Sequence, residues 1–114
     1  MVLEFFKGGA DRTLEDIEGT IVEMLLTGRH IFDLAVNTVL GGTEATTVGK
    51  EIRKSDRSIN KAERHIRREL VVHVSVRGSQ ADLPRVLVAM SVIKDAERIG
   101  DYAKNIWDLS LIHI

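Results

Sequence analysis

Several residue types are scarce in this chain, and each scarcity excludes a class of protein. The 114 residues include no cysteine, which excludes disulfide scaffolds, zinc knuckles and thiol nucleophiles and is compatible with a reducing cytoplasm. No apolar run approaches the roughly 20 residues that span a bilayer. The N-terminus is also too short to read as a signal peptide. We therefore expect a soluble protein.

The sequence signatures of common enzymes are missing as well. Serines and histidines are present, but no nucleophile elbow or oxyanion-hole sequence accompanies them. Gly41 and Gly42 are not followed by the Lys-Ser/Thr pair of a phosphate-binding loop. Glu69 and His73 are four residues apart, whereas di-iron bundles use a Glu-x-x-His spacing. We expect no catalytic activity.

What is present is an ordinary globular composition with an uneven charge distribution. Hydrophobic residues make up 44% and charged residues 29% of the chain, and the net charge is −1. Residues 1–49 carry a net charge of −5, residues 50–68 carry +5 and residues 69–114 carry −1. The overall balance argues against a general nucleic-acid binder, although the middle segment is strongly basic.

Glycines divide the chain into three segments of similar length, each with helical periodicity. Helices are predicted over about 13–40, 46–77 and 82–109. Residues 70–76 are rich in β-branched side chains, but a lone strand would have no partner, so the second helix is extended through them. Equal helices and short loops predict an all-α, antiparallel up-down-up three-helix bundle. We place this domain at 10–110 and expect 111–114 to be a non-native tail or a truncation point.

The helix faces are predicted from the spacing of apolar residues. Thr13 and Asp16 have the spacing of a capping box. On the first helix the apolar arc includes Phe32 and Val39, and on the third it begins with Leu83 and Leu87.

Four acidic residues are expected on these apolar arcs. Asp56 and Glu63 lie close to the isoleucine line of the second helix, and Glu97 and Asp101 follow the arc that begins with Leu83. A buried carboxylate is costly unless it is paired or binds a metal. Two interpretations remain open: ion pairs with Arg64, Arg67, Lys94 or Arg98, or a metal site.

The short sequence segments around these acids resemble those of a known family. The third helix reads Glu97-Arg98-Ile99-Gly100-Asp101, followed by Ala103 and Asn105-Ile106. The second helix has Asp56, then Ile59-Asn60, then Glu63, and the third begins Asp82-Leu83-Pro84-Arg85. These strings are similar to those of the PhoU family of phosphate-signalling proteins. The resemblance spans about residues 14–109.

The resemblance implies a cytoplasmic, non-enzymatic regulator of phosphate uptake. Family members bind multinuclear iron or zinc clusters through E/D-x-x-x-D motifs, which here correspond to Glu97 and Asp101, with Asp56 and Glu63 as further ligands. Asn60 and Asn105 would orient those ligands. The typical member has two such bundles, so we expect either a second PhoU-like repeat or a homodimer.

Seven cations share one arc of the second helix, opposite its isoleucines. They are Lys50, Arg53, Lys54, Arg57, Lys61, Arg64 and Arg68. A solvated face, a docking surface for an acidic protein and a nucleic-acid surface are the alternatives. We expect no specific nucleic-acid binding, because no groove-reading motif or stacking aromatic accompanies the arc. By the resemblance, the partner would be the ATPase of the phosphate transporter or the associated sensor histidine kinase.

Two other functions remain open at this stage. The chain is also compatible with a regulatory domain of a sodium–phosphate cotransporter. A plain helical oligomerisation module without metal is the alternative of a different class. His73, beside Leu70, is expected at the edge of the core, and His30 is expected to be exposed.

Overall fold

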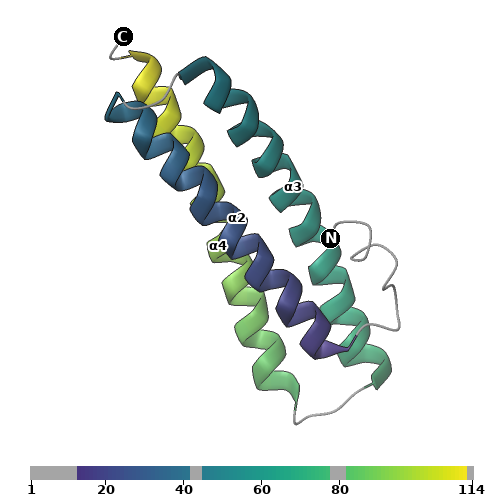
Figure 1. Cartoon of the computed structure of the whole chain (residues 1–114). Coiled ribbons are helices and arrows are strands. Elements are labelled where there is room, and N and C mark those ends of the chain that lie inside the picture. The colour runs from purple at the N-terminus through teal and green to yellow at the C-terminus, as the bar shows by residue number, and fades with distance from the viewer. Residues whose placement is uncertain (1–12, 42–44, 78–81, 113–114) are drawn as a thin grey trace.

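Three long helices form an antiparallel bundle in the computed structural model, which describes residues 13–41, 45–77 and 82–112. The helices are α2 (Leu14–Val39), α3 (Ala45–Val72) and α4 (Leu83–Ile112). Helices α2 and α4 run in the same direction and α3 runs against them (Figure 1). Strands are absent from the described residues. The predicted three-helix, up-down-up architecture is confirmed.

Helix α2 begins and ends where its sequence signals stand. The Thr13 hydroxyl accepts a hydrogen bond from the Asp16 amide (3.1 Å), and the Asp16 carboxylate accepts one from the Thr13 amide (3.2 Å). This capping box satisfies backbone donors that the first helical turn leaves unpaired. After Leu40, Gly41 adopts a positive φ of 81°, which favours glycine and stops the helix.

The core follows the same alternating spacing of three and four residues in all three helices. This spacing is that of left-handed coiled-coil packing, in which one seam of each helix faces its neighbours. The buried seam positions are 14, 17, 21, 24, 28, 31, 35 and 38 in α2; 45, 49, 52, 56, 59, 63, 66 and 70 in α3; and 86, 89, 93, 96, 100, 103, 107 and 110 in α4.

The apolar arcs drawn from the sequence need correction at their large residues. Leu83 and Leu87 are exposed, whereas Val86, which was predicted on the same arc, is buried together with Ala89. Phe32 and Val39 also reach solvent. Half of the core seam of α4 is alanine or glycine, and at Gly100 the facing helix leaves no room for a Cβ. Glu97 and Asp101, which were placed on the arc of Leu83 and Leu87, consequently lie beside the core and not within it.

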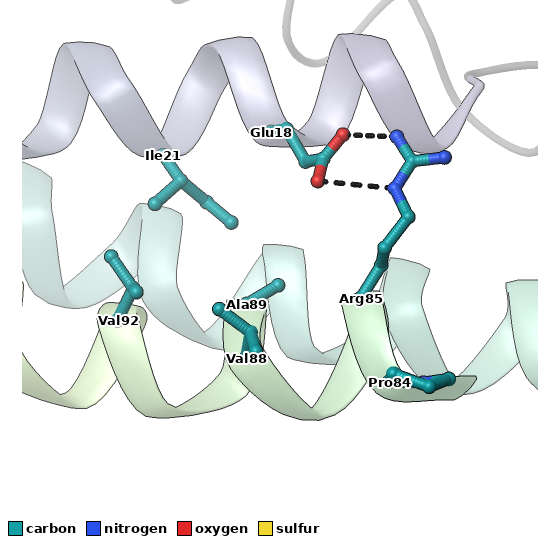
Figure 2. A pocket seen from close by; sticks show the side chains of 7 residues that line it. All are labelled: Glu18, Ile21, Pro84, Arg85, Val88, Ala89 and Val92. Carbon is teal, nitrogen blue, oxygen red and sulfur yellow. Dashed lines mark hydrogen bonds and ion pairs between the residues drawn. The ribbon is translucent and has the colours of Figure 1, made fainter. Parts of the chain in front are cut away.

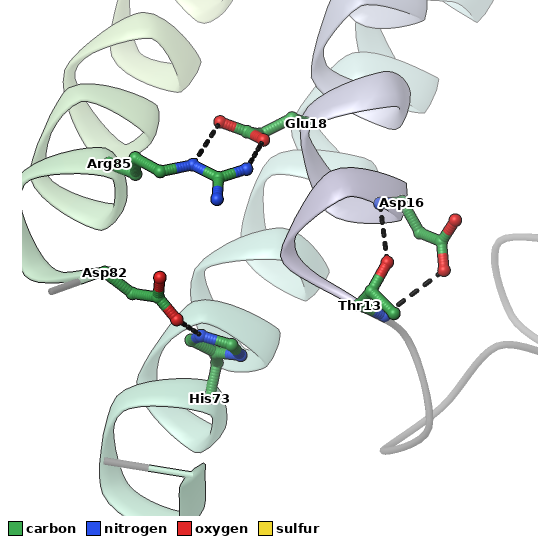
Figure 3. A network of polar contacts seen from close by, with 6 residues as sticks. All are labelled: Thr13, Asp16, Glu18, His73, Asp82 and Arg85. Carbon is green, nitrogen blue, oxygen red and sulfur yellow. Dashed lines mark hydrogen bonds and ion pairs between the residues drawn. The ribbon is translucent and has the colours of Figure 1, made fainter. Parts of the chain in front are cut away.

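The β-branched end of α3 remains helical. After Val72, residues His73–Arg77 form a π-helical turn. His73 is largely buried, as predicted, and its Nε2 lies 3.0 Å from the Asp82 carboxylate, just before α4 (Figure 3). This contact joins the end of α3 to the start of α4. Helix α4 continues through Ile112, two residues into the predicted tail, and residues 113–114 lie outside the described part of the chain.

Trp107 anchors the other end of α3. Its indole N–H donates to the Ala45 carbonyl at 2.6 Å, and Gly49 leaves the space that its ring occupies. A Cβ at Gly49 would lie 2.2 Å from the ring, so only glycine fits there. Arg53 covers the ring, with its guanidinium carbon 4.7 Å from the ring centroid.

No described helix is long and apolar enough to cross a membrane.

Candidate functional site

Asp56 lies in the core seam of α3, as the sequence predicted. Asp56 is only 3% exposed to solvent. The carboxylate oxygen Oδ2 lies 3.0 Å from the Lys104 ammonium of α4 and accepts a hydrogen bond of 3.3 Å from the Asn60 amide. The bond to Asp56 raises the pKa of Lys104, with nearby Asp56 and Asp101 charge adding to the shift. The buried charge is therefore compensated by a lysine from the facing helix.

Gly100 leaves room for this carboxylate. A Cβ at Gly100 would lie 2.7 Å from the Asp56 oxygen Oδ1, closer than a side chain tolerates. That oxygen is buried and has no hydrogen-bond partner among the described residues. The glycine within the family-like string is thus explained by packing: it lets α4 pass directly over Asp56.

Glu63 lies one heptad further along the same seam, and its surroundings are different. Its carboxylate is 2.9 Å from the Arg67 guanidinium on its own helix. Burial raises the pKa of Glu63, and a hydrogen bond with Glu97 of α4 raises it further, while Arg67 lowers it. Two carboxyl groups therefore meet across the α3–α4 seam.

The four predicted metal ligands do not form one centre. Asp56 and Asp101 are both directed to Lys104, the latter at 3.7 Å, whereas Glu63 and Glu97 pair with each other. Among the described residues, no three acidic or histidine side chains are placed to hold a metal ion. Asn105 is exposed and forms no hydrogen bond within the described part of the chain. In this structure the Lys104 ammonium stands where a cation would bind Asp56.

The outer surface of α3 carries a straight row of cations. We call this row the α3 basic stripe: Lys50, Lys54, Arg57, Lys61, Arg64 and Arg68. Its members are spaced four and three residues apart, are all exposed, and cover about 27 Å at 1.5 Å per residue. Arg53, predicted with them, covers Trp107 instead.

Most cations of the stripe are not neutralised by the part of the chain that the structure describes. Among the described residues, Lys50, Lys54, Arg57, Arg64 and Arg68 have no ion-pair partner; Lys61 does form an interaction. The acids of α3 lie elsewhere, with Asp56 and Glu63 in the core. Like charges three and four residues apart on a helix repel each other. The stripe is therefore an exposed cationic surface on which five of the six charges have no ion-pair partner among the described residues.

Sequence reasoning missed Lys104, the partner of Asp56. It lies one turn after Gly100, and the acids were instead matched with Arg64, Arg67, Lys94 and Arg98. Of these, Arg67 does pair with Glu63, whereas Arg98 lies 3.6 Å from Asp95 on its own helix. His30 is exposed, as predicted, and contacts Glu51 of α3 at 2.9 Å.

Comparison with known proteins places the chain in a family. The family model of the PhoU domain matches residues 21–109, which include most of the core seam positions of the three helices. Neither the search of curated proteins nor that of solved structures gave a match. The family is regulatory and related to phosphate transport. By its sequence and by its three-helix fold, this chain belongs to the PhoU domain family.

Proposed function

We propose that this protein is a non-enzymatic, cytoplasmic regulator of phosphate uptake or phosphate signalling that acts by binding an acidic partner protein through the α3 basic stripe. The family match supports the regulatory role. The single observation that carries the binding surface is a row of exposed cations, five of which (Lys50, Lys54, Arg57, Arg64 and Arg68) have no ion-pair partner in the described chain.

A solvated helix face selected for stability would not have this composition. Alternating acids and bases at spacings of three and four residues stabilise a helix, whereas like charges destabilise it by about 0.2–0.5 kcal/mol per pair. The stripe contains five neighbouring pairs of like charge, and an acidic partner would relieve all of them. Charge complementarity of this kind also raises the rate of association.

The chemistry of the stripe favours a protein partner. Arginine and lysine side chains in one straight row match carboxylates on a helix of similar spacing. The stripe itself contains no aromatic side chain to stack on bases. We take the ATPase of the phosphate transporter as the first partner to test and the associated sensor histidine kinase as the second.

The test is binding of the purified transporter ATPase to the immobilised protein. Arg57→Glu should weaken binding about tenfold, because one attractive contact becomes repulsive. Arg98→Glu is the matched control, with the same charge change on an exposed arginine of α4, and should change binding less than about twofold. Equal effects of both variants, or no binding of either the ATPase or the sensor kinase by the wild type, would contradict the proposal.

Metal binding by Glu97 and Asp101 is a separate prediction that comes from the family resemblance. Its test is elemental analysis of protein purified without chelators, for the wild type and for Glu97→Gln/Asp101→Asn. Stoichiometric iron or zinc that disappears in the folded double variant would support it. A metal-free wild type, or metal content that is the same in both proteins, would contradict it.

A further inference from the structure

The outer surface of α2 carries a second row with the same spacing as the α3 basic stripe. We call it the α2 stripe: Val22, Leu26, Arg29, Asp33, Val36 and Leu40. Val22 is 54%, Leu26 58% and Leu40 76% exposed, and Val36 is half-buried. Arg29 and Asp33 are exposed and have no ion-pair partner in the described chain.

The chemical types along the stripe are symmetric about its centre, except that a base on one side corresponds to an acid on the other. Two apolar residues stand at each end, and one base and one acid stand in the middle. When such a stripe packs antiparallel against a copy of itself, Val22 faces Leu40, Leu26 faces Val36 and Arg29 faces Asp33. Each unpaired charge thereby meets an opposite charge.

We propose that the α2 stripe is the interface between two copies of this chain, packed antiparallel about a two-fold axis that passes close to Ile31. A two-fold axis requires one surface to be complementary to itself. The α2 stripe meets that condition in both hydrophobicity and charge. The α3 basic stripe cannot meet it, because two copies would repel each other.

Helix α4 extends this surface on one side. Val88, Tyr102 and Leu109 repeat at multiples of seven residues, on the side of α4 where Val88 meets α2. They are 63%, 55% and 51% exposed. Together with the apolar members of the α2 stripe they expose roughly 600 Å² of side-chain surface, against about 800 Å² per partner in a standard interface. This area is at the upper end of the largest apolar patches that monomeric proteins expose, and such patches are often functional.

The surface also has a hollow at the Val22 end and the exposed side chain of Leu40 at the other end. The hollow, about 300 Å³, lies between α2 and α4 and is lined by Ile21, Pro84, Val88, Ala89 and Val92 (Figure 2). Glu18 and Arg85 form an ion pair at its edge, so covering it leaves no uncompensated charge there (Figures 2 and 3). Antiparallel pairing brings Leu40 of the second copy to Val22, next to Ile21 and this hollow.

The first test is a charge exchange measured by sedimentation equilibrium. The wild type should be dimeric once its concentration is raised to about 100 μM. Arg29→Asp and Asp33→Arg should each weaken dimerisation about tenfold, because each creates two like-charge contacts across the axis. Arg29→Asp/Asp33→Arg restores opposite charges at both positions and should restore the dimer. A monomeric wild type, or a double variant as weak as the two single variants, would overturn the proposal.

The second test fixes the direction of packing. Because the chain has no cysteine, single cysteines can be introduced at chosen positions. A short bis-maleimide should cross-link Leu26→Cys with Val36→Cys in a mixture, and should not cross-link either variant with itself. Self-cross-linking of Leu26→Cys would indicate parallel packing and overturn the proposal. Both tests use the protein alone, so they can fail or succeed independently of the acidic partner.

Discussion

The outer surfaces of α2 and α3 have the same geometry and opposite chemistry. Both present six residues at spacings of four and three, over residues 22–40 on α2 and its C-cap and over residues 50–68 on α3. The α3 basic stripe is cationic throughout, whereas the α2 stripe has apolar ends and one pair of opposite charges. A surface of one sign needs a different molecule as its partner, and a self-complementary surface accepts a copy of itself. One bundle thus has two faces that do not compete for the same partner.

The sharpest way to separate the two faces is to reverse charge on one of them. Arg57→Glu with Arg64→Glu should weaken binding of the transporter ATPase about a hundredfold, because two attractive contacts become repulsive. Binding is measured by interferometry and the dimer by sedimentation. Dimerisation should be unchanged, because the α2 stripe is not altered. Loss of the dimer in this variant would show that the two faces are coupled.

Both faces are carried by a folded bundle, whose stability depends on the close packing of α4 against α3. Gly100→Ala should lower the free energy of unfolding by about 1–2 kcal/mol, because the new methyl group displaces the buried Asp56 carboxylate. Gly19→Ala is the matched control: nothing lies within 4 Å of its Cβ position, so the variant should gain about 0.5–1 kcal/mol from helix propensity. Urea denaturation measures both. Changes of the same sign would contradict the packing at Gly100.

Salt should distinguish the faces without any substitution. Raising the salt concentration from about 0.05 to 0.3 M should weaken ATPase binding roughly tenfold, because exposed charges are screened. The dimer, held mainly by apolar contacts, should weaken less than about threefold. Titrations at several salt concentrations measure both constants. An ATPase complex that resists salt better than the dimer would reverse the assignment of the two faces.

The smallest effect is expected in the interior, at Glu63. Its pKa in the folded protein is raised above 4.5 by burial and by Glu97, so the folded state holds this proton more tightly than the unfolded state does. Stability from this group is therefore present below about pH 4.5 and is lost as the pH rises through the folded pKa. Glu63→Gln should abolish this pH-dependent loss of unfolding free energy, which amounts to less than about 1 kcal/mol in the wild type. Denaturation of both proteins from pH 4 to about pH 7 tests it, and identical pH profiles would contradict it.

Much of the fold could be predicted from local signals. Capping residues, glycines and periodicity give the helices, and the position of Asp56 and Glu63 relative to the isoleucines indicates their burial correctly. The buried face of α4 was predicted less well. Its seam is made of small residues such as Ala96, Gly100 and Ala103, and large exposed leucines outweigh these in any count of apolar residues. The strict spacing of three and four residues is the signal that would have identified the seam.

The contacts of the acids could not be predicted, because they depend on the register between α3 and α4. That register places Asp56 opposite Gly100 and brings Lys104 within reach. It also places Glu63 against Glu97. Nothing in the sequence near Asp56 identifies a lysine almost fifty residues later as its partner. The α2 stripe was missed for a different reason: its apolar residues lie outside the core arc predicted for this helix and were given no role.

The most direct test of the central claim is the affinity of the transporter ATPase for three proteins measured side by side: the wild type, Arg57→Glu and Arg98→Glu. The account predicts that Arg57→Glu binds about tenfold more weakly and that Arg98→Glu binds as the wild type does. Equal affinities of all three proteins would show that the α3 basic stripe is only a solvated surface and would contradict the account.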